Sequence, residues 1–128
     1  MGQSGYLVIC NATSYDWTRT HHHSYQMNDW DFPAVIPAYT SVGVRVEFDE
    51  DIFKIPSDDS GEADYKIDFP LYSQKLEFAV KFRDLFLRVF NRASDAAPGW
   101  QLDLGWRNNG TVVFVLAGAP EYLYYMSQ

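Results

Sequence analysis

The chain has 128 residues, 10 basic and 17 acidic side chains, and a formal net charge of −7. Its length predicts one domain over residues 1–128 and is enough for a hydrophobic core. A single cysteine, Cys10, excludes an internal disulfide framework and a cysteine-rich zinc fold. The acidic balance argues against nucleic acid as a partner, because the protein would repel a phosphate backbone.

The N-terminal residues contain no basic segment followed by a long apolar run, so no secretory signal peptide is predicted. The longest apolar run lies within residues 111–119 and is too short to span a membrane. We therefore expect no transmembrane segment. The expected location is the cytoplasm, or outside the cell after export without a visible signal peptide.

The first predicted element is the apolar run at residues 6–10, Tyr-Leu-Val-Ile-Cys. A continuous apolar run is typical of a central strand buried on both faces, and residues 111–117 repeat the pattern near the other end of the chain. Within the first run, Cys10 is interpreted as a small buried hydrophobe.

The segment at residues 15–32 lacks clean alternation and is dense in aromatic, His and Asp side chains. It is interpreted as a recognition loop, because Trp and Tyr rings bind sugars, choline groups and membrane interfaces. The candidate ligand-binding residues are Trp17, His21, His23, Tyr25, Asn28, Asp29, Trp30 and Asp31. The alternative is that Trp17 and Trp30 close the open ends of a β-sandwich.

Two polar clusters raise the question of a metal site. The first is the run of three His at residues 21–23, of which only His21 and His23 share a face in an extended segment. The second is the stretch at residues 47–68, which holds nine carboxylates but lacks the spacing of an EF-hand. Both are interpreted as solvated loops, and neither a metal nor another cofactor is predicted.

Four segments alternate strictly between apolar and polar residues, and they lie at 42–48, 63–69, 76–82 and 100–106. Period two predicts antiparallel strands with one face in the core and one in water. The segment at residues 84–91 is bulky on both faces, so we favour a strand and keep a short helix as the alternative.

Two further signals complete the chain. Asn108-Asn109-Gly110 predicts a tight hairpin with a type I′ turn, and residues 122–126 predict a short aromatic closing strand. Together the elements predict an all-β fold, a single-domain antiparallel β-sandwich of seven to nine strands.

The layout of residues 6–70 resembles the aegerolysin-like and actinoporin-like β-sandwich proteins. The resemblance lies in an apolar strand that ends in Asn (residues 6–13), a Pro-x-x-Ile-Pro bend (residues 33–37) and an acidic Gly turn before a Tyr-centred strand (residues 61–67). It implies membrane recognition by aromatic loops, in some members followed by pore formation. Residues 1–5 are too short for the amphipathic N-terminal helix of actinoporins, so pore formation by this chain alone is not implied.

No nucleophile elbow, zinc-protease motif, P-loop or dinucleotide fingerprint occurs, so no enzyme is predicted. The leading hypothesis is a non-enzymatic module that binds a lipid headgroup or membrane surface. An apolar or zwitterionic surface suits an acidic protein better than an anionic one. The alternatives are a carbohydrate-binding lectin, in which Asn28, Asp29 and Trp30 contact a glycan, and a structural protein without a small ligand. The latter would form a homo-oligomer through Tyr122, Tyr124 and Tyr125.

Overall fold

The computed structural model describes residues 4–49, 59–70, 73–81, 86–93, 100–105, 107–119 and 122–127. At residues 86, 91–93, 100, 118–119 and 122–127 it describes the backbone alone. Within these ranges the chain forms eleven strands and no helix, so none of the described residues forms a helix able to cross a membrane. The strands are β1 (Ser4–Ala12), β2 (Trp17–Tyr25), β3 (Met27–Trp30), β4 (Val35–Ile36), β5 (Thr40–Phe48), β6 (Ser60–Asp68), β7 (Ser73–Lys81), β8 (Phe86–Ala93), β9 (Trp100–Gly105), β10 (Gly110–Ala119) and β11 (Tyr122–Ser127).

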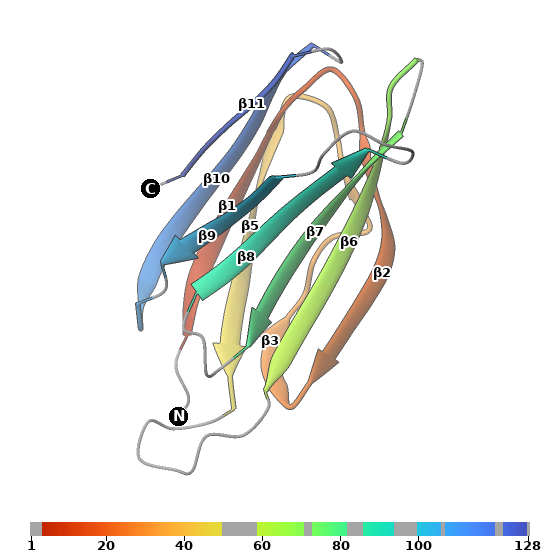
Figure 1. Cartoon of the computed structure of the whole chain (residues 1–128). Coiled ribbons are helices and arrows are strands. Elements are labelled where there is room, and N and C mark those ends of the chain that lie inside the picture. The colour runs from red at the N-terminus through yellow and green to blue at the C-terminus, as the bar shows by residue number, and fades with distance from the viewer. Residues whose placement is uncertain are drawn as a thin grey trace.

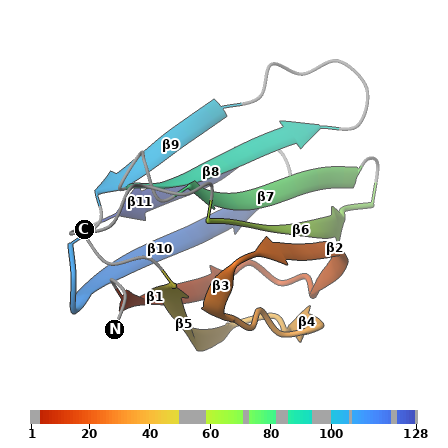
Figure 2. The same cartoon turned by 90° about the horizontal axis from the view of Figure 1, so that it is seen from below.

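The strands form two sheets that pack face to face (Figures 1 and 2). Sheet A has the order β11-β10-β1-β5-β3, and sheet B has the order β4-β2-β6-β7-β8-β9. The predicted all-β sandwich is confirmed. Two of the strands beyond the expected nine are the short elements β3 and β4, whose four and two residues give too little alternation to be recognised.

One pair of strands departs from the antiparallel pattern. β1 and β10 run parallel, in continuous register from Gly5 opposite Gly110 to Ala12 opposite Ala117. The other pairs of the described strands are antiparallel. The first and the second-last strands of the chain therefore lie side by side in the middle of sheet A.

The core lies between the sheets and is built from the predicted apolar faces. Alternating positions of β5, β6 and β7 are at most 3% exposed: Val44, Val46, Phe48, Ala63, Tyr65, Ile67, Leu76, Phe78 and Val80. Phe78 of sheet B meets Phe114 of sheet A edge to face, with ring centroids 5.5 Å apart. The predicted core residues Phe82 and Trp106 lie outside the described residues.

The segment at residues 84–91 is a strand where it is described. β8 places Leu87 and Val89 in the core, both with no exposed surface, and pairs with β7 and β9. Residues 84 and 85 lie outside the described part. The strand interpretation is confirmed over residues 86–91.

The prediction of a hairpin at Asn108-Asn109-Gly110 is wrong. β9 belongs to sheet B and β10 to sheet A, so the turn carries the chain from one sheet to the other. Only Asn109 of its two central residues has a positive φ, 61°, whereas a type I′ turn needs two. The turn is tied to β1 instead, because Ser4 N–H donates to Asn108 Oδ1 (3.0 Å) and Asn109 N–H donates to the Ser4 carbonyl (2.7 Å).

The two continuous apolar runs are central strands, but each buries only one face within this chain. Tyr6 is 49% exposed, and Val8, Cys10, Val113 and Val115 are half-buried. A two-layer sandwich covers only the inner face of a central strand, which explains the difference. Cys10 is consequently half-buried on the outer face, where its Sγ accepts a hydrogen bond from the Ser41 hydroxyl (3.2 Å).

Candidate functional site

Most of residues 15–32 form strands rather than a recognition loop. β2 lies in sheet B and β3 in sheet A, and Gln26 between them has a φ of 57°, so the segment closes one side of the sandwich. The register of β2 against β6 shifts between Arg19 and His21. This irregularity interrupts the inside–outside alternation, which explains why the sequence pattern did not reveal a strand.

The structure buries Trp17 and Trp30, contrary to the prediction that they contact a ligand. Trp17 has no exposed surface, and its Nε1–H donates to Thr13 Oγ1 (3.3 Å). Trp30 is 3% exposed, and its Nε1–H donates to the Glu62 carbonyl (3.0 Å). Both rings belong to the core, so the expected exposed patch of Trp17, Tyr25 and Trp30 does not form.

His21, His23 and Tyr25 lie on the outer side of β2 and are exposed. The imidazole rings of His21 and His23 stack with centroids 6.4 Å apart, and His21 Nε2 lies 3.3 Å from Glu62 Oε2. Among the residues that the structure describes, no group of three or more His, Cys, Asp or Glu side chains is arranged to hold a metal ion. These side chains therefore make a polar strand surface.

Asn28 and Asp29 belong to a separate cluster on sheet A. Arg45 contacts Asp29 Oδ2 through Nε (3.2 Å) and Glu47 Oε1 through Nη2 (2.7 Å), and Asn28 Nδ2 donates to Glu47 Oε2 (2.9 Å). These hydrogen bonds from Arg45 and Asn28 lower the pKa of Glu47. The exposed ring of Tyr6 lies beside the guanidinium of Arg45, 5.9 Å from ring centroid to Cζ.

The residues expected to form one site are thus spread over the molecule. β2 has nine residues, which places Trp17 and Tyr25 about 26 Å apart at opposite ends of the strand. Asp31 is exposed just after β3. The side chains of Tyr122, Tyr124 and Tyr125 lie outside the described part, where only the backbone of β11 is defined.

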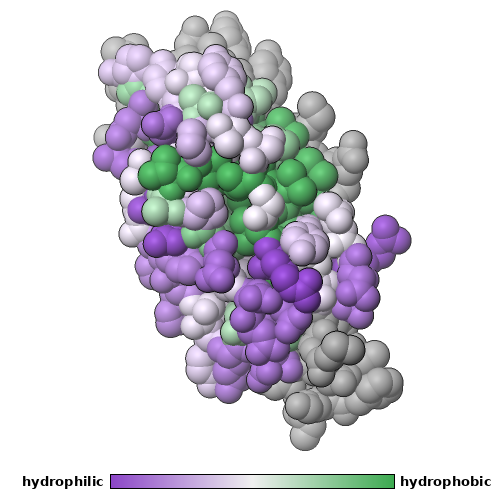
Figure 3. Space-filling model, turned by 180° about the vertical axis from the view of Figure 1, so that it is seen from behind, coloured by the Kyte–Doolittle hydropathy of each residue, from purple (hydrophilic) through white to green (hydrophobic). Residues whose placement is uncertain are grey.

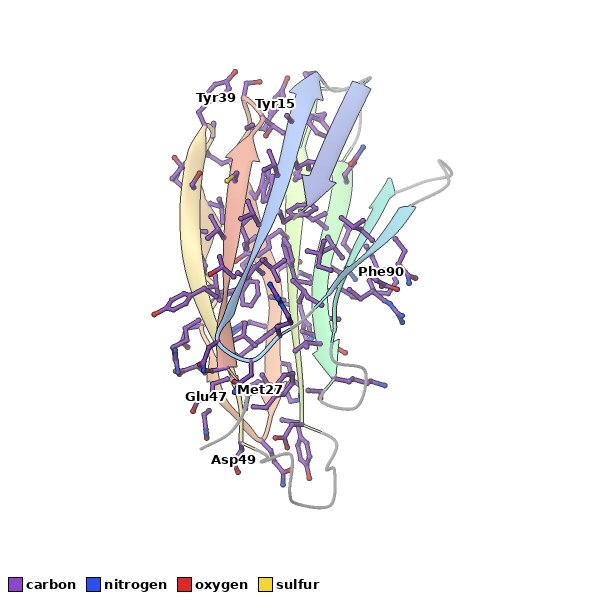
Figure 4. The ribbon with its side chains drawn as sticks, turned by 90° about the vertical axis from the view of Figure 1, so that its left-hand side faces the viewer. Tyr15, Met27, Tyr39, Glu47, Asp49 and Phe90 are labelled. Carbon is purple, nitrogen blue, oxygen red and sulfur yellow. The ribbon has the colours of Figure 1, made fainter. Side chains whose placement is uncertain are left out.

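The most exposed large hydrophobic side chain among the described residues is one that the sequence did not single out. Tyr39 is 74% exposed and sits just before β5 with a φ of 57°, which an L-residue with a bulky side chain rarely adopts. Figure 4 shows Tyr39 at the end of the sandwich next to Tyr15, opposite the end that carries Glu47, Met27 and Asp49.

Two segments meet at this end, residues 13–16 and residues 33–39, the second of which includes the short strand β4, and we call them together the Tyr39 tip. The Tyr39 N–H donates to the Thr13 carbonyl (3.2 Å), and the Ala38 N–H donates to Asp16 Oδ1 (2.9 Å). Val35 is also 43% exposed. The tip therefore presents apolar and aromatic surface to solvent from a backbone that is bonded in place.

A buried asparagine, Asn11, connects the two segments of the tip from the interior of the protein. Asn11 is 1% exposed, and its Nδ2 donates to the carbonyls of Tyr15 (2.8 Å), Ile36 (3.0 Å) and Pro37 (3.1 Å). Its Oδ1 accepts from the Thr13 backbone N–H (3.0 Å) and hydroxyl (2.6 Å). The two N–H groups of the amide are shared among three carbonyls and its oxygen accepts two hydrogen bonds, so it fixes the two segments relative to each other.

Sheet B anchors the other part of the tip. The Tyr65 hydroxyl donates to the Pro33 carbonyl (2.6 Å), and the Arg19 N–H donates to the Ala34 carbonyl (2.8 Å). Burial raises the pKa of Tyr65, so the phenol keeps its proton and remains a donor. These bonds pre-organise the tip, which reduces the entropy cost of binding.

The tip contains one charged side chain, Asp16, within residues 13–16 and 33–39. An exposed tyrosine ring on the same tip as a carboxylate suits a ligand that carries a cationic group on an apolar body. The Pro33–Pro37 bracket marks the loop in the sequence, but the exposure of Tyr39 depends on the left-handed backbone, which no periodicity reveals.

No protein-family model matches the chain, and no curated protein matches it either. A functional assignment therefore rests on the residues of this chain.

Proposed function

We propose that the protein is a non-enzymatic binding module that recognises zwitterionic lipid headgroups at a membrane surface through the Tyr39 tip. The observation that carries the proposal is the ring of Tyr39, 74% exposed on a left-handed backbone that is held by hydrogen bonds. Strained backbone and exposed aromatic surface are both costly for a folded chain, and they cluster at binding sites.

The chemistry of the tip favours a choline headgroup. Tyrosine rings attract quaternary ammonium groups through cation–π contact, and the Asp16 carboxylate adds charge of the complementary sign. Tyrosine also prefers the membrane–water interface, where its ring is apolar and its hydroxyl is wet. A net charge of −7 disfavours anionic lipid, so phosphatidylcholine and sphingomyelin are the expected lipids. The resemblance to aegerolysin-like and actinoporin-like proteins supports the same class of partner.

The test is co-sedimentation with vesicles of phosphatidylcholine, of sphingomyelin with sterol, and of phosphatidylglycerol. We compare the wild type with Tyr39→Gly, which removes the ring and accepts the positive φ. The matched control is Gln26→Gly, because Gln26 has the same φ of 57° and joins β2 to β3 at a site remote from the tip.

Wild type and Gln26→Gly are expected to bind the two choline lipids, and Tyr39→Gly to bind them roughly tenfold more weakly, the size of one good cation–π contact. Binding to phosphatidylglycerol should be the weakest of the three. Absence of wild-type binding to every choline vesicle, or equal binding by Tyr39→Gly, would refute the proposal.

The second candidate function is a lectin, and the cluster around Arg45 favours it. An exposed Tyr6 ring can stack on the C–H face of a sugar while Arg45, Asp29 and Asn28 bind its hydroxyls. A glycan array with wild type and Tyr6→Ala decides this case. Binding that is lost in Tyr6→Ala, with no vesicle binding, would favour the lectin over the lipid-binding module.

A further inference from the structure

The outer face of sheet A carries a continuous apolar surface at its centre. Leu7, Ile9, Val112, Phe114 and Leu116 point into the core, so the residues between them point outward. These outward residues are Val8, Cys10 and Ala12 of β1 with Val113, Val115 and Ala117 of β10, which we call the apolar face. Figure 3 shows this side of the molecule, with apolar residues gathered into one area across the strands.

The two sheets differ in the charge of their outer faces. Among the described outward side chains of β1, β5 and β10, only Arg45 and Glu47 are charged, and they neutralise each other at 2.7 Å. The outer face of sheet B carries a row of ions on β6, β7, β8 and β9: Glu62, Lys66, Lys75, Glu77, Arg88 and Asp103. The outer face of sheet B is therefore well solvated. The apolar face of sheet A has no charged side chain for water to solvate.

The parallel pairing of β1 with β10 also indicates that the outer face of these two strands is covered by a partner. Parallel strands that read as continuous apolar runs are normally covered on both faces, and here the sandwich covers one. The centre of the second face is built from small and β-branched residues, with Gly43 and Ser41 of β5 beside Val8 and Cys10, and the larger Tyr6 and Arg45 side chains lie toward the N-terminal end of β1. Small side chains at the centre of a face let another sheet approach to about 10 Å, the spacing of packed sheets.

We propose that the apolar face packs against the same face of a second copy of this chain, as a two-fold symmetric dimer. The five strands of sheet A have nine, four, nine, ten and six residues in chain order, which gives the whole sheet an outer face of about 600 Å² per copy, with the apolar face at its centre. A dimer that packs the whole of this face would lie at the lower end of the roughly 600–1,000 Å² per partner that standard stable interfaces bury. A second copy is also the partner that the charges favour, because two molecules of net charge −7 repel least where each presents a neutral face.

The test compares a charge placed on each outer face. Val113→Arg puts a guanidinium at the centre of the apolar face, opposite its own symmetry mate. Ala79→Arg is the matched control, since Ala79 is equally half-buried but lies on the outer side of β7, between Glu62 and Arg88. Sedimentation velocity over 1–200 µM gives the mass, and circular dichroism reports whether each variant is folded.

Wild type and Ala79→Arg are expected to sediment at twice the chain mass of 14.8 kDa at high concentration. Val113→Arg should remain a monomer, with a dimer dissociation constant raised roughly 100-fold or more, because like charges would meet in a desolvated interface. A wild-type monomer at 200 µM, or a dimer that Val113→Arg leaves intact, would overturn the proposal. So would vesicle binding by a monomeric wild type that Val113→Arg abolishes, since the face would then contact lipid.

Cys10 gives a second readout that needs no substitution and works even if Val113→Arg does not fold. It is the single cysteine and lies within the apolar face. In the dimer, its reaction with a thiol reagent should slow at least fivefold between 1 and 200 µM protein. A rate independent of concentration would contradict a dimer at this face. Neither readout involves the Tyr39 tip, so the two proposals stand or fall separately.

Discussion

Gly61 of β6 is the position where a single added methyl group should be felt most. Its Cα lies under the indole ring of Trp30, so a Cβ at this site would lie 2.5 Å from Trp30 Cδ2 and Cε2 and 2.9 Å from Cε3. Carbon atoms in normal contact lie about 3.5–4.0 Å apart. Gly61→Ala therefore requires the ring to retreat by about 1 Å or more.

The surroundings of Trp30 resist that movement. The ring packs against Phe32 with centroids 4.6 Å apart, and its Nε1–H is bonded to the Glu62 carbonyl. Overpacking costs about 1–3 kcal/mol, a weakened hydrogen bond adds about 1, and the change from Gly to Ala in a strand returns about 0.5–1. We expect Gly61→Ala to lower the free energy of unfolding by about 2–3 kcal/mol, and Tm by roughly 8–12 °C for a chain of this length.

Urea and thermal unfolding, followed by circular dichroism, measure the effect. The control is Gly43→Ala in β5, where an added Cβ meets no atom within 4 Å. It should be neutral or slightly stabilising. In a Trp30→Phe background, which makes room above the strand, Gly61→Ala should cost less than half as much. Equal stability of Gly61→Ala and Gly43→Ala, or an undiminished cost beside Trp30→Phe, would refute the steric reasoning.

Three further expectations follow from groups at the tip and on sheet B. Asn11→Ala should lower the free energy of unfolding by about 3–4 kcal/mol in urea, because it removes the hydrogen bonds to the buried Ile36 carbonyl and to two partly buried carbonyls. A loss below about 1 kcal/mol would show that these carbonyls find other partners. Burial and the neighbouring Asp64 raise the pKa of Glu77, so the native state binds the Glu77 proton more tightly than the unfolded state does. The stability gained from this proton is fully present below the pKa of Glu77 in the unfolded state and is lost as the pH rises through its pKa in the folded state. Glu77→Gln should therefore raise Tm relative to wild type at pH 7 but not at pH 3.5, and an equal difference at both pH values would contradict this. Tyr39→Gly should leave Tm unchanged or raise it slightly, because it relieves a left-handed backbone; a fall above 5 °C would mean that the ring stabilises the fold.

Strict alternation made the sandwich predictable. In β5, β6 and β7 the large apolar residues face the core at every second position and most of the residues between them are polar, so a two-residue period was enough to predict these strands. β2 was not predicted because the register shift near Arg19 breaks that period, and β3 was not predicted because its four residues give too little alternation. The position of the turn at Asn109 was predicted correctly, but the strand that pairs with β10 after the turn was not: it is β1 and not β9. The residues of a turn do not reveal distant hydrogen bonds, such as those with Ser4 that hold this turn beside β1 in sheet A.

The candidate site was less predictable than the fold. The many aromatic residues in residues 15–32 suggested exposed rings. Trp17 and Trp30 are instead buried, and the single N–H of each indole donates a hydrogen bond inside the protein. Composition cannot distinguish a buried indole with a satisfied donor from an exposed one. Tyr39 was overlooked because its exposure comes from a backbone angle.

The parallel pair of β1 and β10 also sets a constraint on how the chain folds. Ser4 and Asn108 are bonded although 104 residues separate them along the chain. Contacts so distant in sequence close late and slow folding, because the intervening chain must first lose its freedom. During synthesis β1 can pair with β5 early, but its other edge stays open until residues 110–119 leave the ribosome. An apolar strand with one unpaired edge invites association with other chains, so the growing polypeptide should be most prone to aggregation just before its last strands emerge.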